Sequence, residues 1–81
     1  MLVYDNIATV KAVIEKKEEL GWSDSKLAKV LGLSSTAIYK WHKGTASPSI
    51  DNLFRMTSLF KVSLTEIAKG YEIDDDFDFT A

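Results

Sequence analysis

Residues 21–44 read GWSDSKLAKVLGLSSTAIYKWHKG, and this stretch decides the fold of the chain. Ser23 and Ser34 each precede a short segment of helical periodicity, and serine is a favoured N-cap because its hydroxyl accepts from a first-turn amide. Gly32 separates the segments, since glycine readily adopts the positive φ that ends many helices. The first segment has an apolar face of Leu27, Ala28 and Leu31, and the second has an apolar face of Ala37, Ile38 and Trp41 opposite a polar face of Ser35, Thr36, Tyr39, Lys40 and Lys43. The sequence therefore predicts two helices joined by a tight turn, from about Ser23 to Lys43.

Further helices are predicted on both sides of this stretch. Before it, residues 5–20 have Ile7, Val10 and Ile14 at helical spacing, with Asp5 as N-cap and Gly21 as the stop. After it, the loop GTASPS leads to Ser49, which begins a helix from Ile50 to about Phe60. The expected inner face of this helix carries Ile50, Leu53, Thr57 and Phe60.

The last predicted helix is short, from Leu64 to Lys69, and Gly70 ends it. Ser63 and Glu66 have the spacing of a capping box, in which each side chain binds a backbone amide at the start of the helix. No segment shows the strand-type alternation of apolar and polar residues. The sequence therefore predicts an all-α fold, a compact bundle of five helices.

Charge is divided unequally between the body of the chain and its end. The net charge of the 81 residues is −2. Residues 1–70 carry all ten Lys and Arg side chains and seven acidic ones, whereas residues 71–81 carry the other five acids. We interpret residues 1–70 as one mildly basic domain and residues 71–81 as an acidic tail. The lack of cysteine, of a signal-peptide pattern and of an apolar run long enough for a bilayer predicts a cytoplasmic protein without membrane contact.

The longer run from Gly21 to Gly70 resembles the Cro-like and Xre-like helix-turn-helix family of phage and bacterial repressors. The resemblance covers roughly residues 7–70 and is carried by Leu27-Ala28, Leu31-Gly32-Leu33-Ser34, Ile38, Lys40-Trp41, Lys43-Gly44, Pro48-Ser49, Leu53, Phe60, Val62-Ser63-Leu64 and Glu66. It implies that the helix at about 34–43 enters the major groove of double-stranded DNA, which admits one α-helix. It implies base contacts by Ser35, Thr36, Tyr39 and Lys40, and phosphate contacts by Lys43, Thr45 and Ser47, with Lys26 as a further phosphate candidate.

Some positions depart from the family's pattern. Asp24 stands where members often have a glutamine that meets phosphate, and a carboxylate there repels phosphate unless it faces away. Lys17 and His42 stand where members commonly pair an arginine with a glutamate, so we expect that buried ion pair to be absent. We expect His42 to be neutral or to meet one acid of the first helix, Glu15, Glu18 or Glu19, and we interpret Lys17 as solubilising charge.

The large apolar residues have two possible roles. Trp22 and Trp41 are interpreted as core residues, because indole rings contribute large buried areas to a small domain. Others exceed the needs of a five-helix core, and they either enlarge that core or form a homodimer interface from Phe54, Leu59, Tyr71 and Ile73. Phe77 and Phe79 lie among acids in the tail, for which a disordered segment is the default expectation. The functional alternatives are that the tail competes with DNA for the basic face or docks on a partner protein.

Catalytic chemistry is not indicated by the sequence. It has one histidine and no cysteine, and it lacks a glycine-rich phosphate loop, so we expect no enzyme activity, no metal and no cofactor. The predicted function is sequence-specific transcription regulation through a near-palindromic operator, bound by a homodimer. The alternative is a protein-interaction module, an antitoxin or adaptor that uses the acidic, aromatic tail.

Overall fold

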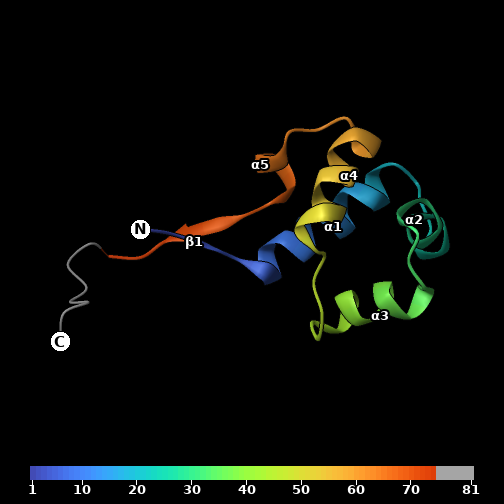
Figure 1. The fold of residues 1–81 in the computed structure, drawn as a ribbon, viewed down its shortest axis with the longest axis horizontal. Coiled ribbons are helices and arrows are strands. Elements are labelled where there is room, and N and C mark those ends of the chain that lie inside the picture. Colours follow the sequence, from blue (N-terminus) through green and yellow to red (C-terminus); the bar gives the residue numbers. More distant parts are fainter. Residues whose placement is uncertain (75–81) are drawn as a thin grey trace.

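Five helices form the body of the protein, as the sequence predicts. The structure is a computed structural model that describes residues 1–74, so the proposed roles of Phe77 and Phe79 lie outside the described residues. The helices are α1 (Asn6–Glu19), α2 (Asp24–Leu31), α3 (Ser35–Lys43), α4 (Ile50–Phe60) and α5 (Leu64–Ile67). Two short strands, β1 (Leu2–Tyr4) and β2 (Gly70–Glu72), pair as an antiparallel ribbon that extends away from the helices (Figure 1).

The predicted caps set the ends of the first four helices. The Asp5 carboxylate accepts from the Ala8 amide at 3.0 Å, and the hydroxyls of Ser23, Ser34 and Ser49 accept in the same way from the amides three residues further on. Gly21, Gly32 and Gly44 all have φ near +70°, which confirms their predicted places at helix ends. These local signals explain why the boundaries could be predicted from sequence.

The predicted capping box of α5 does not form. The Ser63 side chain makes no cap hydrogen bond, and its hydroxyl lies 3.2 Å from the hydroxyl of Thr65 instead. The helix has only four residues and ends at Ile67 rather than Lys69, so Gly70 does not stop it. The Glu66 amide, which the box would direct to the Ser63 hydroxyl, donates to the Ser63 carbonyl at 3.1 Å instead.

A single apolar core lies between the helices. Leu27, Ile38, Leu53, Met56 and Ile67 are among its fully buried side chains. Trp41 is buried in the same cluster, and Trp22 packs against the cluster half-buried, with its ring 5.5 Å from that of Phe60 in an edge-on arrangement. The core assignment of both tryptophans is therefore confirmed.

The buried face of α1 differs from the predicted one. Thr9, Val13 and Lys17, at spacing i, i+4 and i+8, are the buried residues of this helix. Of the apolar residues at helical spacing named from the sequence, Val10 packs against the core half-buried, whereas Ile7 is 79% exposed. The helix is rotated because Thr9 and Lys17 have hydrogen-bonding partners that sequence spacing does not reveal.

The predicted inner face of α4 is right in part. Leu53 and Phe60 are buried, but the third buried residue of the helix is Met56, while Thr57 is half-buried and Ile50 is exposed. Met56 lies three residues after Leu53 and four before Phe60, so it shares their face of the helix.

The ribbon was not predicted, because strands of three residues are too short to show a period. Leu2 pairs with Glu72, Val3 with Tyr71 and Tyr4 with Gly70. Its base is held to α1 by Lys69, whose amide donates to the Thr9 hydroxyl and whose carbonyl accepts from the Asp5 amide, each at 2.9 Å. A Cβ at Gly70 would lie 2.9 Å from the Val3 carbonyl oxygen, so glycine is needed for this close approach. The proposed division between residues 70 and 71 falls inside β2.

Candidate nucleic-acid interface

A tight turn fixes α2 and α3 relative to each other. Gly32 caps α2 in the left-handed conformation, with φ of 69°, and the Leu33 amide then donates to the Ala28 carbonyl at 2.8 Å. Two residues later the Ser34 hydroxyl caps α3. Leu33 packs against the core, which anchors the middle of the turn. The two helices therefore meet at an angle set by local hydrogen bonds, and they pack against each other directly.

The outward face of α3 is free of the rest of the described chain. Ile38 and Trp41 hold the helix to the core. On the opposite face the side chains predicted to contact bases or phosphate are all exposed, and they are Ser35, Thr36, Tyr39, Lys40 and Lys43. The Tyr39 side chain is 58% exposed, so a large aromatic ring lies at the surface of a helix that is otherwise polar there.

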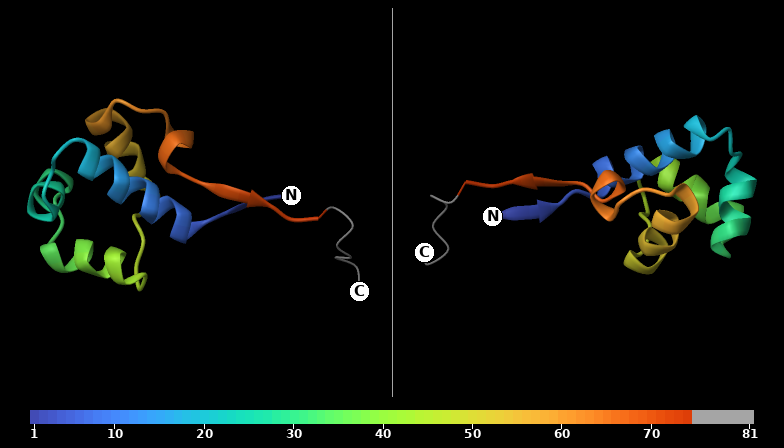
Figure 2. Two further views of the ribbon diagram at one scale, coloured as in Figure 1. Left: turned by 180° about the vertical axis from the view of Figure 1, so that it is seen from behind. Right: turned by 90° about the horizontal axis from the view of Figure 1, so that it is seen from above.

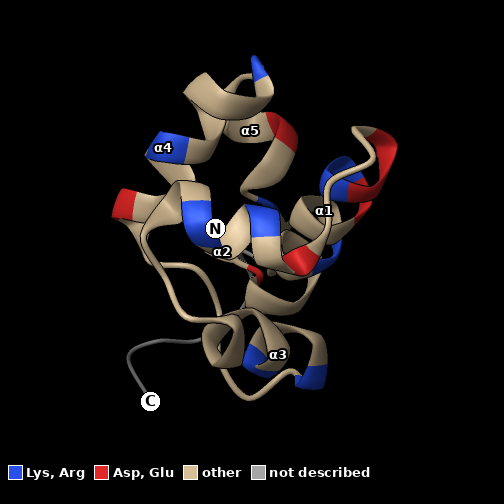
Figure 3. Cartoon of the chain, turned by 90° about the vertical axis from the view of Figure 1, so that its right-hand side faces the viewer, with Lys and Arg blue, Asp and Glu red and all other residues tan. Residues whose placement is uncertain are grey.

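Only positive charge occurs on α3. Figure 3 shows lysines but no Asp or Glu on this helix. The Lys43 ammonium lies over the Tyr39 ring, 5.6 Å from its centroid, so these two side chains support each other. A cationic, uncovered helix face of this kind attracts a polyanion.

The other phosphate candidates occupy three different settings. The Thr45 hydroxyl is exposed and donates to the Lys40 carbonyl at 3.3 Å, which ties the loop to the end of α3. The Ser47 hydroxyl is half-buried and donates to the Asn6 side-chain oxygen at 3.4 Å. The Lys26 ammonium lies 4.7 Å from the centroid of the Trp22 ring. The structure thus brings Thr45 next to α3 and leaves Lys26 on α2.

Two polar residues of α4 adjoin α3 and were missed in the sequence analysis. An open groove of about 320 Å³ is lined by Thr36 and Lys40 of α3 and by Ser49 and Asn52 at the start of α4. The Ser49 hydroxyl is occupied by its cap to the Asn52 amide. The position of Asn52 in the first turn of a capped helix after Pro48 was the available signal, but only the fold places that turn beside α3.

Lys17, Asp24 and His42 form a charge cluster that joins α1, α2 and α3. The Lys17 side chain is nearly buried, at 6% exposure, and its ammonium lies 3.0 Å from Asp24 Oδ1 and donates to the Trp22 carbonyl at 3.2 Å. His42 Nε2 lies 3.1 Å from both carboxylate oxygens of Asp24. The buried charge of Lys17 is therefore compensated by a residue at the start of α2.

This cluster corrects three expectations. Lys17 is a buried structural residue rather than solubilising charge, and an ion pair does exist at this place, with Asp24 as the acid. His42 meets Asp24, and not Glu15, Glu18 or Glu19. The hydrogen bond from His42, and with it the Lys17 ammonium, hold the pKa of the Asp24 carboxyl below its ordinary value. Asp24 is therefore held in its ionised form in the folded protein, paired with the Lys17 ammonium and hydrogen-bonded to His42.

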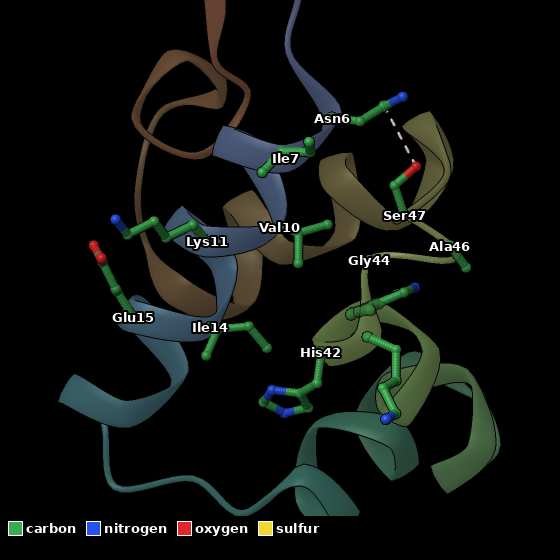
Figure 4. A pocket seen from close by; sticks show the side chains of 12 residues that line it. Asn6, Ile7, Val10, Lys11, Ile14, Glu15, His42, Gly44, Ala46 and Ser47 are labelled. Carbon is green, nitrogen blue, oxygen red and sulfur yellow. Dashed lines mark hydrogen bonds between the residues drawn. The ribbon is translucent and has the colours of Figure 1, made fainter.

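A second open groove, also of about 320 Å³, lies between α1 and the end of α3 (Figure 4). Ile7, Val10 and Ile14 line its α1 side, and Val10 also packs against the core. Trp41 and Ala46 contribute from the other side.

The residues predicted to form a dimer interface fall in two places. Phe54 and Leu59 are exposed on α4, within the helical body. Tyr71 lies on β2 and Ile73 directly follows it, so both belong to the ribbon that projects from that body (Figure 2). The structure therefore does not bring these four residues together into one patch.

Two helices joined by a tight turn, with a cationic and uncovered second helix, define a helix-turn-helix protein. A helix-turn-helix family model matches residues 13–67. The chain therefore belongs to this family, of the Cro-like and Xre-like kind that the sequence resembles. It is a family of DNA-binding transcription regulators and not of enzymes, as predicted.

One curated relative and several solved structures are similar to the chain. The relative is named as an HTH-type transcriptional regulatory protein of Methanocaldococcus jannaschii, with 37% identity over 68 residues. The match covers 84% of this chain but only 21% of the relative, so the chain spans about a fifth of that protein's length.

The fold is shared with two regulators of known structure. A transcriptional regulator from Listeria innocua aligns with a TM-score of 0.71 and 20% identity over 91% of this chain and 67% of its own. The restriction-modification controller protein C.AhdI from Aeromonas hydrophila aligns with a TM-score of 0.66 and 19% identity over 78% of this chain and 96% of its own.

Within residues 1–74, no helix is long and apolar enough to cross a membrane.

Proposed function

We propose that the protein is a sequence-specific transcription regulator that inserts the helix at about 34–43 into the major groove of double-stranded DNA. The observation that carries this proposal is the outward face of α3, which is exposed and has lysine as its only charged residue type. The family membership supports the same function. The domain for this function is residues 1–70, followed by the acidic segment 71–81.

Within this proposal the side chains divide into readers and positioners. Ser35, Thr36, Tyr39 and Lys40 contact base edges, and the Lys40 ammonium donates to the acceptors of a guanine. Lys43, Thr45, Ser47 and Lys26 contact phosphates, which fixes the register of the helix without reading sequence. The exposed position of Lys40, on the groove beside Asn52, supports its assignment as a reader.

The test has two stages. Selection of bound duplexes from a random pool gives the preferred site, and we expect a near-palindrome. On that site Lys40→Ala should weaken binding by about 1–3 kcal/mol and relax the base preference at one position, whereas Lys43→Ala should weaken all sequences alike and lower the salt slope. Lys11→Ala removes an exposed lysine of α1 and is the matched control for charge alone. Equal effects of all three substitutions on every duplex would refute the proposal.

We also propose that the protein binds its operator as a homodimer. A twofold pair presents two recognition helices one DNA turn apart, about 34–36 Å, and reads a palindrome. Exposed apolar side chains lie in two separate places, Phe54 and Leu59 on α4 and Tyr71 on the ribbon, and each place is a candidate for self-association. Sedimentation at micromolar concentration, with and without the selected duplex, tests this. A monomer in both cases would contradict it.

A further inference from the structure

The ribbon is an unusual feature for a protein of five small helices. It projects from the body in all views, so little of the body covers it (Figures 1 and 2). Leu2 is 69% exposed and Tyr4 is 47% exposed, although both are large and apolar. A two-stranded ribbon is marginally stable by itself in water and is normally stabilised by a third strand or by a packed face.

The hydrogen-bond pattern identifies the free groups of β1. The Met1 amine donates to the Ile73 carbonyl at 3.1 Å, and the Ile73 amide donates back to the Met1 carbonyl at 2.9 Å. Reciprocally bonded pairs alternate with non-bonded pairs along an antiparallel ladder. Val3 therefore points its amide and carbonyl toward β2, whereas Leu2 and Tyr4 point theirs away from β2, toward the open edge.

We propose that the open edge of β1 pairs with β1 of a second copy of the chain, antiparallel and centred on Val3. Leu2 then lies opposite Tyr4 of the second copy at both ends, and the two pairs are joined by four backbone hydrogen bonds. The result is a four-stranded sheet with a helical body at each end. This inference rests on the proposed dimeric function and names the surface that forms the dimer.

Charge favours the β1 edge over the β2 edge. Residues 1–4 carry no charged side chain, and in this register the Met1 ammonium of each copy lies opposite Asp5 of the other, so two β1 edges meet without like-charge repulsion. The β2 edge carries the carboxylate of Glu72, and Asp74 follows two residues later. Pairing two β2 edges would bring these acids from both copies into one small region, and like charges across a sheet are destabilising. β2 also contains Gly70, and glycine disfavours a paired strand.

Disulfide trapping tests the register of the pairing. In the proposed sheet the two Val3 residues face each other in a non-hydrogen-bonded position, with Cα atoms about 4.5 Å apart. This separation lies within the range of a disulfide, about 4.4–6.8 Å. The chain has no cysteine, so Val3→Cys introduces a single thiol. On mild oxidation of the full chain we expect the disulfide-linked dimer as the main product.

Two further cysteine variants serve as controls. Tyr71→Cys lies one strand further out on each side, so the two thiols would be about 14 Å apart and should not link. Phe54→Cys reports on pairing through α4. Linkage of Tyr71→Cys or Phe54→Cys in place of Val3→Cys would overturn the proposal in favour of the β2 edge or α4, and the absence of linkage in all three would overturn it as well.

A second pair of variants tests the pairing without a covalent bond. Tyr4→Pro removes an amide that points to the open edge and keeps the ladder to β2, so it should convert the dimer to a monomer in sedimentation. Tyr4→Phe keeps the amide and the ring and should remain a dimer. Slow hydrogen exchange at the Val3 amide in Tyr4→Pro would confirm that the ribbon itself persists. A Tyr4→Pro dimer as stable as the unmodified one would refute the pairing.

These outcomes are separable from the test of DNA binding. A chain that selects a palindrome but gives no Val3→Cys linkage keeps the proposed function and loses the β1 pairing. A chain that links through Val3→Cys but binds no duplex keeps the pairing and loses the proposed function.

Discussion

Replacement of Asp24 by asparagine tests whether the charge cluster holds the helix-turn-helix to α1. The substitution removes the carboxylate that faces the Lys17 ammonium at 3.0 Å and leaves the ammonium with the Trp22 carbonyl as its hydrogen-bond acceptor. Because Lys17 is 6% exposed, its charge then lacks a compensating anion in a poorly solvated place.

The expected cost follows from the burial of the two partners. Breaking a fully buried pair costs about 3–5 kcal/mol, whereas an exposed pair contributes at most about 1 kcal/mol. The Asp24 side chain is 45% exposed, so solvent screens the pair in part, and we expect a loss of about 2 kcal/mol. For a domain of this size that loss lowers Tm by about 8–16 °C.

The double-mutant cycle gives the sharper result. Lys17→Met replaces the buried ammonium by an apolar side chain of similar length and should cost less than about 1 kcal/mol. When Asp24→Asn is added to Lys17→Met, no buried ammonium is left without its anion. The double variant should therefore be more stable than Asp24→Asn alone. Asp51→Asn, which breaks the exposed pair with Arg55, is the matched control and should cost less than about 1 kcal/mol.

Urea unfolding followed by circular dichroism measures all four variants. The pH dependence of stability provides an independent check. Because the pKa of the Asp24 carboxyl is lower in the folded state, the unfolded state takes up the proton at a higher pH than the folded state does. The stability from Asp24 is therefore complete above the ordinary Asp pKa, about 3.9, and is lost as the pH falls below it. In Asp24→Asn the unfolding free energy should therefore fall less steeply as the pH is lowered through this range. Simple additivity of Asp24→Asn and Lys17→Met would refute the reasoning.

Three further predictions concern the fold. Ile7→Ala should change stability by less than about 0.5 kcal/mol in urea unfolding, while Val13→Ala should cost about 2 kcal/mol, and the reverse order would restore the face expected from sequence. Gly32→Ala should lower the unfolding free energy by about 1–2 kcal/mol because its φ is +69°, and an unchanged urea midpoint would contradict this. Gly70→Ala should open the ribbon while leaving the helices intact, which hydrogen exchange at Val3 would detect, and a Val3 amide as protected as in the unmodified chain would speak against it.

The helical part of the fold could be predicted because its signals are local. A serine that caps a helix and a glycine that ends one act within a few residues, so Ser23, Gly32 and Ser34 identify the turn without knowledge of the rest. The free face of α3 followed in the same way, since its polar residues share one side of a regular helix. The sequence was therefore sufficient to predict which face of α3 is exposed.

The remainder depended on contacts between distant segments. Lys17 is buried only because Asp24 and the Trp22 carbonyl meet its ammonium across the junction of α1 and α2, and helical spacing cannot show such partners. The ribbon pairs residues 2–4 with residues 70–72, and neither strand is long enough to display its own period. Asn52 and Lys40 line the same groove because the loop between α3 and α4 brings the start of α4 beside α3. The sequence does not show the path of that loop.

The charge cluster also removes an objection to DNA binding. An isolated carboxylate at Asp24 would repel a phosphate near the start of α2, and the sequence alone places it there. In the structure that carboxylate pairs with the Lys17 ammonium at 3.0 Å and is hydrogen-bonded to His42, so its charge is compensated by Lys17. Since His42 belongs to α3, its hydrogen bond to Asp24 also ties the recognition helix to the start of α2. The departures at Asp24, Lys17 and His42 therefore depend on one another. Replacing Asp24 alone by the family's glutamine would leave the buried Lys17 without its anion rather than improve the DNA-binding face.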